Sequence, residues 1–217
     1  DLTRSPRDWH VFEDDFDFYL ATSFVITETG SGTRAISQSD NGNLVITNAA
    51  ADNDVNSLQY RDVASGQVAE HWKFVSGKPM GFGCRFKVSD ATQSDLLIGL
   101  HITATAPITT PPTDGIFFRK DDGDRLIDFV GRKNDTASTV TGVLGVNGYL
   151  TDDTFTTLEW WYDGVSSLIT AYQDGVPFGA IPLTNVVDDE ELVISFAHQN
   201  GEAVAKILTL DHIWAMK

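Results

Sequence analysis

Hydrophobic and polar residues alternate along most of the chain. In Pro79–Val88 (PMGFGCRFKV), every second residue is apolar. A period of two places successive side chains on opposite faces of a β-strand. No segment shows a helical period over three turns, so the pattern predicts an all-β protein.

The same pattern recurs roughly every 10 to 15 residues, with Gly, Asp and Asn in the gaps, which is typical of a β-sandwich or barrel. Beyond Pro79–Val88, the predicted strands are Asn43–Asn48, Ser57–Arg61, Leu96–Thr103, Gly115–Lys120, Leu126–Arg132, Thr139–Val143, Phe155–Tyr162, Leu168–Gln173, Leu192–His198 and Ile207–Ala215. A strand over Phe12–Phe18 stays open. No composition shift marks a second domain, so we expect one sandwich over residues 12–217, preceded by an extended N-terminal arm of residues 1–11.

Three Asp-Gly dipeptides stand between predicted strands: Asp122-Gly123, Asp163-Gly164 and Asp174-Gly175. Asp-Gly accommodates the positive φ of tight hairpin turns. We therefore expect Gly115–Lys120 to pair with the following strand through a turn at Asp122-Gly123. Residues Thr103–Asp114, which include three prolines, are predicted to form a loop, and so are residues Arg132–Thr139.

The chain is acidic, with 31 Asp and Glu against 15 Lys and Arg and a formal net charge of −16. No basic cluster is present, which argues against nucleic-acid binding. No apolar run of about 18 residues could form a membrane-spanning helix. The single cysteine, Cys84, lies in an alternating apolar segment, so we expect a buried and unreactive thiol, and a chain folded in a reducing cytoplasm.

Residues 154–181 (TFTTLEWWYDGVSSLITAYQDGVPFGAI) contain an aromatic strand ending in Tyr-Asp-Gly and a following strand ending in Asp-Gly. This arrangement resembles concanavalin A-like and laminin-G-like jelly rolls, and the resemblance covers most of the chain from about residue 12. It implies an antiparallel β-sandwich of the concanavalin A-like jelly-roll type.

Four segments also resemble virion structural proteins of tailed bacteriophages: residues 12–18 (FEDDFDF), 87–100 (KVSDATQSDLLIGL), 113–129 (TDGIFFRKDDGDRLIDF) and 188–213 (DDEELVISFAHQNGEAVAKILTLDHI). This resemblance implies a virion component, of the kind that decorates the head.

Residues 13–17 nearly match the Glu-x-Asp-x-Glu line of jelly-roll glucanases. Glu13, Asp15 and Asp17 would share one strand face, as the nucleophile and acid of such enzymes must. The last member is Asp, however, and the line precedes the first confident strand. The histidines are scattered without zinc-binding spacing, and no Gly-x-Ser-x-Gly motif occurs. We therefore predict no catalytic residue and a protein that is not an enzyme.

Many lectin-like sandwiches hold calcium with loop carboxylates and carbonyls. The candidate acidic clusters are Asp121/Asp122/Asp124, Asp52/Asp54, Asp152/Asp153 and Asp188/Asp189/Glu190. Asp121-Asp122-Gly123-Asp124 lacks both the spacing and the later Glu of an EF-hand loop, so no metal or other cofactor is predicted. A calcium site assembled from two distant loops stays an open alternative.

Trp160 and Trp161 are adjacent on one predicted strand, so one should point inward and the other outward. The outward ring could be a sugar platform, could cover the sheet or could make a contact between subunits. Packing or a protein interface is favoured, because Trp is enriched in such contacts.

The preferred hypothesis is a capsid decoration protein on the exterior of a phage head, assembled in the host cytoplasm. Its partners would be the major capsid protein and copies of itself, as a homotrimer. The N-terminal arm, with Arg4, Arg7 and Trp9, would order on binding a neighbour. The alternative is a carbohydrate-binding lectin-like module that recognises surface glycans through Trp160 or Trp161. Neither hypothesis includes nucleic-acid binding or membrane insertion.

Overall fold

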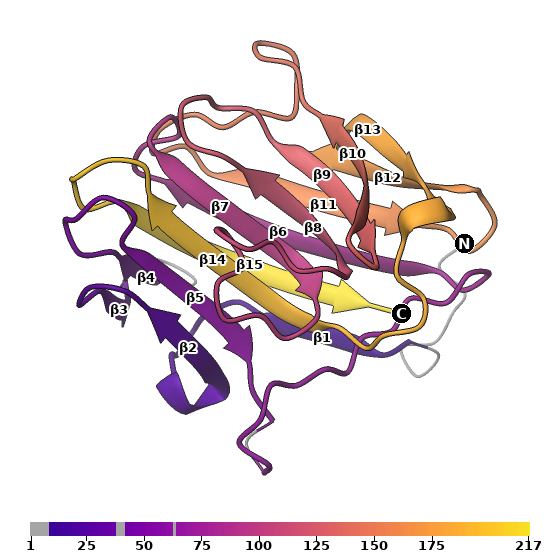
Figure 1. Cartoon of the computed structure of the whole chain (residues 1–217), viewed down its shortest axis with the longest axis horizontal. Helices are drawn as coiled ribbons and strands as arrows, with labels where there is room; N and C mark the ends of the chain where they lie inside the picture. The colour runs from indigo at the N-terminus through magenta and orange to yellow at the C-terminus, as the bar shows by residue number, and fades with distance from the viewer. Residues whose placement is uncertain (1–8, 38–41, 63) are drawn as a thin grey trace.

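Two antiparallel sheets pack face to face in the computed structural model, which describes residues 9–37, 42–62 and 64–217 (Figure 1). The all-β sandwich is therefore confirmed. The strands are β1 (Val11–Asp14), β2 (Phe24–Glu28), β3 (Thr33–Ile36), β4 (Leu44–Thr47), β5 (Val55–Tyr60), β6 (Met80–Val88), β7 (Ser94–His101), β8 (Gly115–Lys120), β9 (Asp128–Lys133), β10 (Thr136–Thr141), β11 (Thr156–Tyr162), β12 (Leu168–Gln173), β13 (Val176–Pro182), β14 (Val193–Asn200) and β15 (Ile207–Met216). Two short 3-10 turns, η2 (Ala21–Ser23) and η3 (Leu183–Asn185), connect strands.

Sheet A has the order β13-β12-β11-β6-β15-β4-β3, and β1 also pairs with β15. Sheet B has the order β10-β9-β8-β7-β14-β5-β2. The first and last strands are hydrogen-bonded neighbours, with Val11 opposite Met216 and Asp14 opposite Ile213. The two ends of the described chain therefore meet at one place in sheet A.

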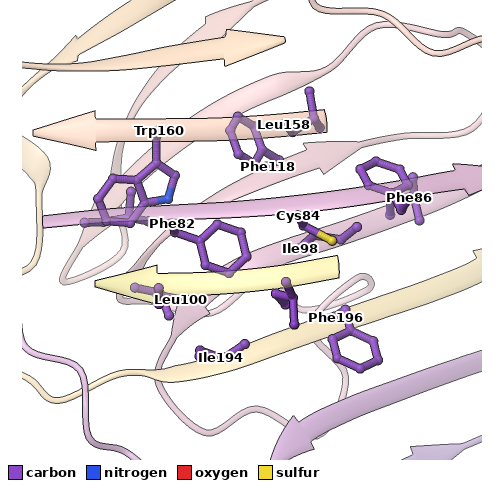
Figure 2. Close-up of a cluster of buried hydrophobic side chains, with 14 of the residues drawn as sticks. Phe82, Cys84, Phe86, Ile98, Leu100, Phe118, Leu158, Trp160, Ile194 and Phe196 are labelled. Carbon is purple, nitrogen blue, oxygen red and sulfur yellow. The ribbon is translucent and has the colours of Figure 1, made fainter. Parts of the chain in front are cut away.

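Alternation decides which side chains fill the space between the sheets. In β6, Phe82, Cys84 and Phe86 point inward and are fully buried, as are Leu158 and Trp160 of β11 (Figure 2). Burial raises the pKa of the Cys84 thiol far above its ordinary value. The prediction of a buried, unreactive cysteine is confirmed.

The Asp-Gly turns are less uniform than predicted. Only Asp174-Gly175 forms a two-residue hairpin, in which Gln173 pairs with Val176 and both turn residues have positive φ. The prediction of a tight turn at Asp122-Gly123 is wrong, because β9 begins at Asp128 and Arg119 pairs with Asp128. Ile127 is instead drawn into the core, which lengthens the connection to residues 121–127.

The possible strand over Phe12–Phe18 forms only in its first part. β1 ends at Asp14, whose Oδ1 accepts a hydrogen bond from the Phe16 backbone N–H at 2.9 Å. Phe16 has a positive φ and a buried ring, so the chain turns into the core there. The arm residues Arg4 and Arg7 lie outside the described residues, and the division at residue 11 stays a prediction.

Candidate functional site

Trp160 and Trp161 lie on opposite faces of sheet A. Trp160 has no exposed surface and its ring lies 6.4 Å from that of Phe82 inside the sandwich (Figure 2). Trp161 is only half-buried and points outward. The predicted alternation is confirmed, and it leaves Trp161 as the platform candidate.

Two glycines of β6 lie beneath indole rings on this outer face. A Cβ atom added to Gly81 would stand 2.4 Å from Cε3 of Trp161, and one added to Gly83 would stand 2.4 Å from Nε1 of Trp214. Trp161 is opposite Gly81 on one side of β6, and Trp214 is opposite Gly83 on the other. Both rings can lie down on the strand only because these positions lack a side chain.

Trp9 extends this arrangement. Its ring centroid lies 6.1 Å from that of Trp161, with 41° between the ring planes. Gly81 and Gly83 are successive outward positions, about 7 Å apart along a strand. We call Trp9, Trp161 and Trp214 the aromatic strip. All three are partly exposed, so the strip presents apolar ring surface at the protein surface.

Polar side chains flank the aromatic strip. Glu159 lies on the outer face between Tyr172 of β12 and Gly83 of β6, and Thr170 is opposite Trp161. Burial, and secondarily the charge of Asp174, raise the pKa of Glu159. These groups supply hydrogen-bond donors and acceptors beside ring surface, the combination that recognises ligands with both apolar and hydroxyl faces.

The outer face of sheet B is covered. Outward-pointing Leu97, Phe117, Val130 and Ala197 are buried beneath Ile108 of the β7–β8 connection, which folds back over the sheet (Figure 1). We call residues 102–114 the covering loop.

Hydrogen bonds fix the covering loop in place. Glu70 accepts from Thr103 N at 2.8 Å and from Thr103 Oγ1 at 2.7 Å. Arg132 donates to the Pro111 carbonyl at 3.2 Å. A cavity of about 210 Å³ remains between the loop and strands β2, β5 and β14, and Ser57 and Gln199 are among its lining residues.

The acidic line at residues 13–17 does not form a pair of catalytic carboxylates. Glu13 lies on β1 at the outer face of sheet A and contacts His212 Nε2 at 3.0 Å. Asp14 accepts from the Tyr60 hydroxyl at 2.8 Å, and Asp17 lies beyond the strand end. Glu159 of β11 is separated from Glu13 of β1 by two intervening strands, because Glu159 pairs with Gly83, Gly83 with Trp214 and Trp214 with Glu13. Three interstrand spacings amount to about 14 Å, which exceeds the separation of the two carboxylates in glycosidases.

Protein donors already contact several of the acidic residues that were candidates for calcium. Among the described residues, no group of three or more His, Cys, Asp or Glu side chains could hold a metal. Near Asp121-Asp122, the buried Lys120 ammonium donates to the carbonyls of Ser94, Asp121 and Thr92 at 2.5, 2.8 and 3.4 Å. A lysine cation therefore takes the place at which carbonyl oxygens converge.

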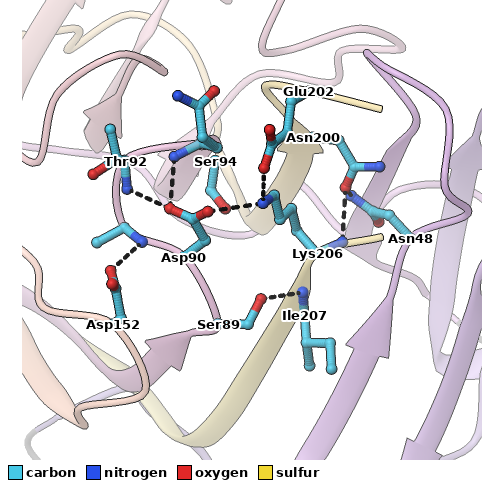
Figure 3. A network of polar contacts seen from close by, with 12 residues as sticks. Asn48, Ser89, Asp90, Thr92, Ser94, Asp152, Asn200, Glu202, Lys206 and Ile207 are labelled. Carbon is cyan, nitrogen blue, oxygen red and sulfur yellow. Dashed lines mark hydrogen bonds and ion pairs between the residues drawn. The ribbon is translucent and has the colours of Figure 1, made fainter. Parts of the chain in front are cut away.

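A second lysine, Lys206, lies between two carboxylates nearby. Lys206 Nζ contacts Asp90 Oδ2 at 2.8 Å and Glu202 Oε1 at 2.5 Å (Figure 3). Burial would raise the pKa of Asp90, but the bond and charge of Lys206 and the backbone N–H groups of Thr92 and Gln93 together lower it. Asp152 accepts from the Ala91 N–H at 2.8 Å and pairs with Arg125 at 3.1 Å.

No protein-family model and no curated protein sequence matches the chain. Solved structures do match. The carbohydrate recognition domain of Emp47p is similar over 95% of this chain and 93% of its own, with a TM-score of 0.63 and 12% sequence identity. The fold is that of lectin-like, concanavalin A-like jelly rolls. A glycoside hydrolase family 16 endo-glucanase from Bacteroides ovatus (TM-score 0.62, 12% identity, 93% and 98% covered) shares it.

An endo-beta-1,4-glucuronan lyase from the fungus Trichoderma reesei also shares the fold, with a TM-score of 0.58, 11% identity and 94% of each chain covered. The prediction that the chain is not an enzyme is therefore wrong, because it has a fold that often serves enzymes. The comparisons give no support to a virion location, a capsid partner or a homotrimer. Among the described residues, no helix is long and apolar enough to cross a membrane.

Sequence reasoning found Trp161 and missed Trp214 and the two glycines. Trp9 was predicted at a subunit interface rather than beside Trp161. A signal was present in the sequence: two outward-facing glycines in β6, with tryptophans in the strands that follow it in the chain. Recognising it requires the order of the strands, which the chain alone does not give.

Proposed function

We propose that this chain is a lectin-like, glycan-binding domain that holds saccharides on the aromatic strip. The observation that carries the proposal is the pair of indoles, Trp161 and Trp214, laid on Gly81 and Gly83 at an exposed sheet face. The similarity to the carbohydrate recognition domain of Emp47p and to a family 16 endo-glucanase supports a saccharide ligand. The capsid-decoration hypothesis rests on sequence resemblance, and no structural observation favours it.

Binding would combine two interactions. The C–H face of a pyranose ring stacks on an indole, which removes apolar surface from water. Glu159, Tyr172 and Thr170 then hydrogen-bond to hydroxyl groups beside the strip. Because the strip is an open surface rather than an enclosed cavity, we expect dissociation constants near about 1 mM for short oligosaccharides, or ~4 kcal/mol of binding free energy.

The test is isothermal titration calorimetry with β-1,4-linked glucose oligomers, following a glycan array. Trp161→Ala and Trp214→Ala should each weaken binding by about tenfold or more, or ~1.4 kcal/mol, and leave the fold intact. Phe18→Ala is the matched control, because Phe18 is an aromatic residue that is 71% exposed and is not part of the strip. Phe18→Ala should bind as the wild type does.

Two results would contradict the proposal. One is wild-type protein that binds no glycan on the array. The other is binding that survives both tryptophan substitutions but is lost in Ser57→Phe, which would move the site to the cavity on sheet B. Because the fold also serves enzymes, the same oligomers should be followed by chromatography for cleavage.

A further inference from the structure

A cavity of about 340 Å³ lies at one end of the aromatic strip and is lined by basic side chains. Its lining residues are His10, Lys73, Val75, Lys78, Pro79, Met80 and Lys217. We call this the lysine pocket. Among the described residues, three of the seven that line the pocket are lysines and none carries a carboxylate side chain, although the chain has 31 acidic residues against 15 basic ones.

Among the described residues the three lysines make no ion pair with a carboxylate, whereas seven of the ten other Lys and Arg residues do. Lys73 donates to the backbone carbonyl of Asp189 at 2.9 Å, and Lys217 donates to that of His71 at 2.7 Å. Lys78 is exposed and makes no ion pair among the described residues. By contrast, the basic residues that pair with carboxylates are Arg34, Arg85, Arg119, Arg125, Arg132, Lys133 and Lys206.

Lys217 is also partly desolvated. Its Nζ lies 5.5 Å from the centroid of the Trp72 ring. Burial lowers the pKa of Lys217, and the charge of Glu191 opposes that shift only in part. A cation in such a position gains more from an arriving anion than a fully hydrated one does.

Three chain segments join the lysine pocket to the aromatic strip. His10 follows Trp9, and Met80 precedes Gly81, over which Trp161 lies. Lys217 follows Met216, which is paired with Gly81. Successive strand residues point to opposite faces, so the pocket lies beyond the strand ends next to Trp9 and Trp161 rather than on the outer face itself. A saccharide stacked on Trp9 and Trp161 would meet the ammonium groups where it extends past the start of β6.

We propose that the lysine pocket binds the carboxylate of an acidic saccharide, a uronate, whose neighbouring sugar rings stack on the aromatic strip. This inference rests on the proposed glycan-binding function and specifies its ligand class. The strip supplies the contacts that neutral sugars share, and the pocket supplies the preference for an anionic sugar. The surrounding negative charge of the protein repels polyanions that make no such local contacts.

The experiment compares two probes with the same linkage: a β-1,4-linked glucose tetramer and a β-1,4-linked glucuronate tetramer. Calorimetry should give at least about tenfold tighter binding of the glucuronate, with a preference that shrinks as salt rises from about 20 mM to about 200 mM. A Lys73→Met/Lys78→Met double variant should lose most of the preference and keep its affinity for the glucose tetramer. Lys87→Met is the charge control, because Lys87 lies on β6 and does not line the pocket. It should behave as wild type.

Each alternative result has a distinct meaning. Equal binding of both tetramers by the wild type overturns the uronate inference and leaves the glycan-binding proposal standing. Absence of binding to either tetramer, or to any glycan on the array, overturns both. Equally tight binding of polyglutamate would show that charge alone is recognised, and would overturn the assignment to a saccharide. A preference that persists in the double variant would place the anion elsewhere and overturn the site.

Discussion

The outer faces of the two sheets both carry aromatic residues but differ in their exposure to solvent. Phe117 points outward from β8 of sheet B, and Trp161 points outward from β11 of sheet A. Neither strand is at the edge of its sheet. Phe117 is 1% exposed because Ile108 and the covering loop pack over it, whereas Trp161 is only half-buried and, among the described residues, contacts Trp9 rather than such a loop. One face has become part of the interior, and the other remains a surface.

This difference shows that strand alternation separates inward from outward side chains but does not predict whether the outward side chains are exposed to solvent. On sheet B, proline-rich residues after β7 return over the strands, and Pro107 and Pro112 are themselves buried. On sheet A, glycines rather than a loop meet the aromatic rings. A ligand site on an open sheet face thus depends on what the neighbouring connections leave uncovered.

The largest expected effect is on the covered face. Phe117→Ala should lower the free energy of unfolding by about 3–5 kcal/mol, because it leaves a cavity beneath the covering loop. Trp161→Ala, at a comparable outward position, should cost about 1 kcal/mol or less. Urea denaturation of both variants measures the contrast. Equal losses would mean that the two faces are equally buried in solution.

The next largest effect is a pH dependence of stability, which arises from a buried histidine next to the covering loop. His101 is fully buried and donates through Nδ1 to the Ile102 carbonyl at 2.6 Å. Burial lowers the pKa of His101 from 6.5 to about 4, against the opposing influence of that bond and of Glu70. The unfolded chain takes up a proton below pH 6.5 and the folded chain does not. Stability should therefore fall as pH drops from 6.5 towards 4, by ~1.4 kcal/mol per pH unit.

Buried His198, whose pKa burial lowers to about 3, adds a slope of the same sign. Asp95 and Glu159, whose pKa values burial raises, act in the opposite direction at the acidic end. His101→Asn isolates one contribution, because it leaves those groups in place. Denaturation at pH 7 and pH 5 should show roughly 2 kcal/mol less acid loss in His101→Asn than in wild type. An unchanged acid loss would show that His101 is not buried as a neutral ring.

The sequence predicted most of the strands and the inward or outward direction of Trp160 and Trp161. It missed β2, β3 and β13, which lie at or next to sheet edges, where short strands and the prolines of β13 weaken the pattern. Residues 132–139, expected as a loop, contain a two-residue turn at Asn134-Asp135, both with positive φ. The aromatic strip could not be predicted, because Trp9, Trp161 and Trp214 meet only through strand pairing between distant segments.

A smaller effect is expected where the covering loop is fastened. Glu70→Ala removes the acceptor for both the N–H and the hydroxyl of Thr103 and should cost about 1 kcal/mol, since the site is exposed. Hydrogen–deuterium exchange should quicken in residues 102–114 and stay unchanged in β6 and β11. Glu202→Ala, which removes a partner of Lys206, is the matched control. Faster exchange throughout the molecule would mean that Glu70 supports the whole sandwich rather than the loop.

The smallest effect on stability should come with a measurable effect on binding. Gly81→Ala replaces a glycine whose added Cβ would stand 2.4 Å from the Trp161 ring, so the indole must move. Because alanine costs less conformational entropy than glycine in a strand, by roughly 0.5–1 kcal/mol, the net change in stability should be near zero. Glycan affinity should nevertheless fall by about five- to tenfold. If the substitution acts only through the ring, the Gly81→Ala/Trp161→Ala double variant should bind as Trp161→Ala does. A further loss in the double variant would mean that the β6 backbone itself contacts the saccharide.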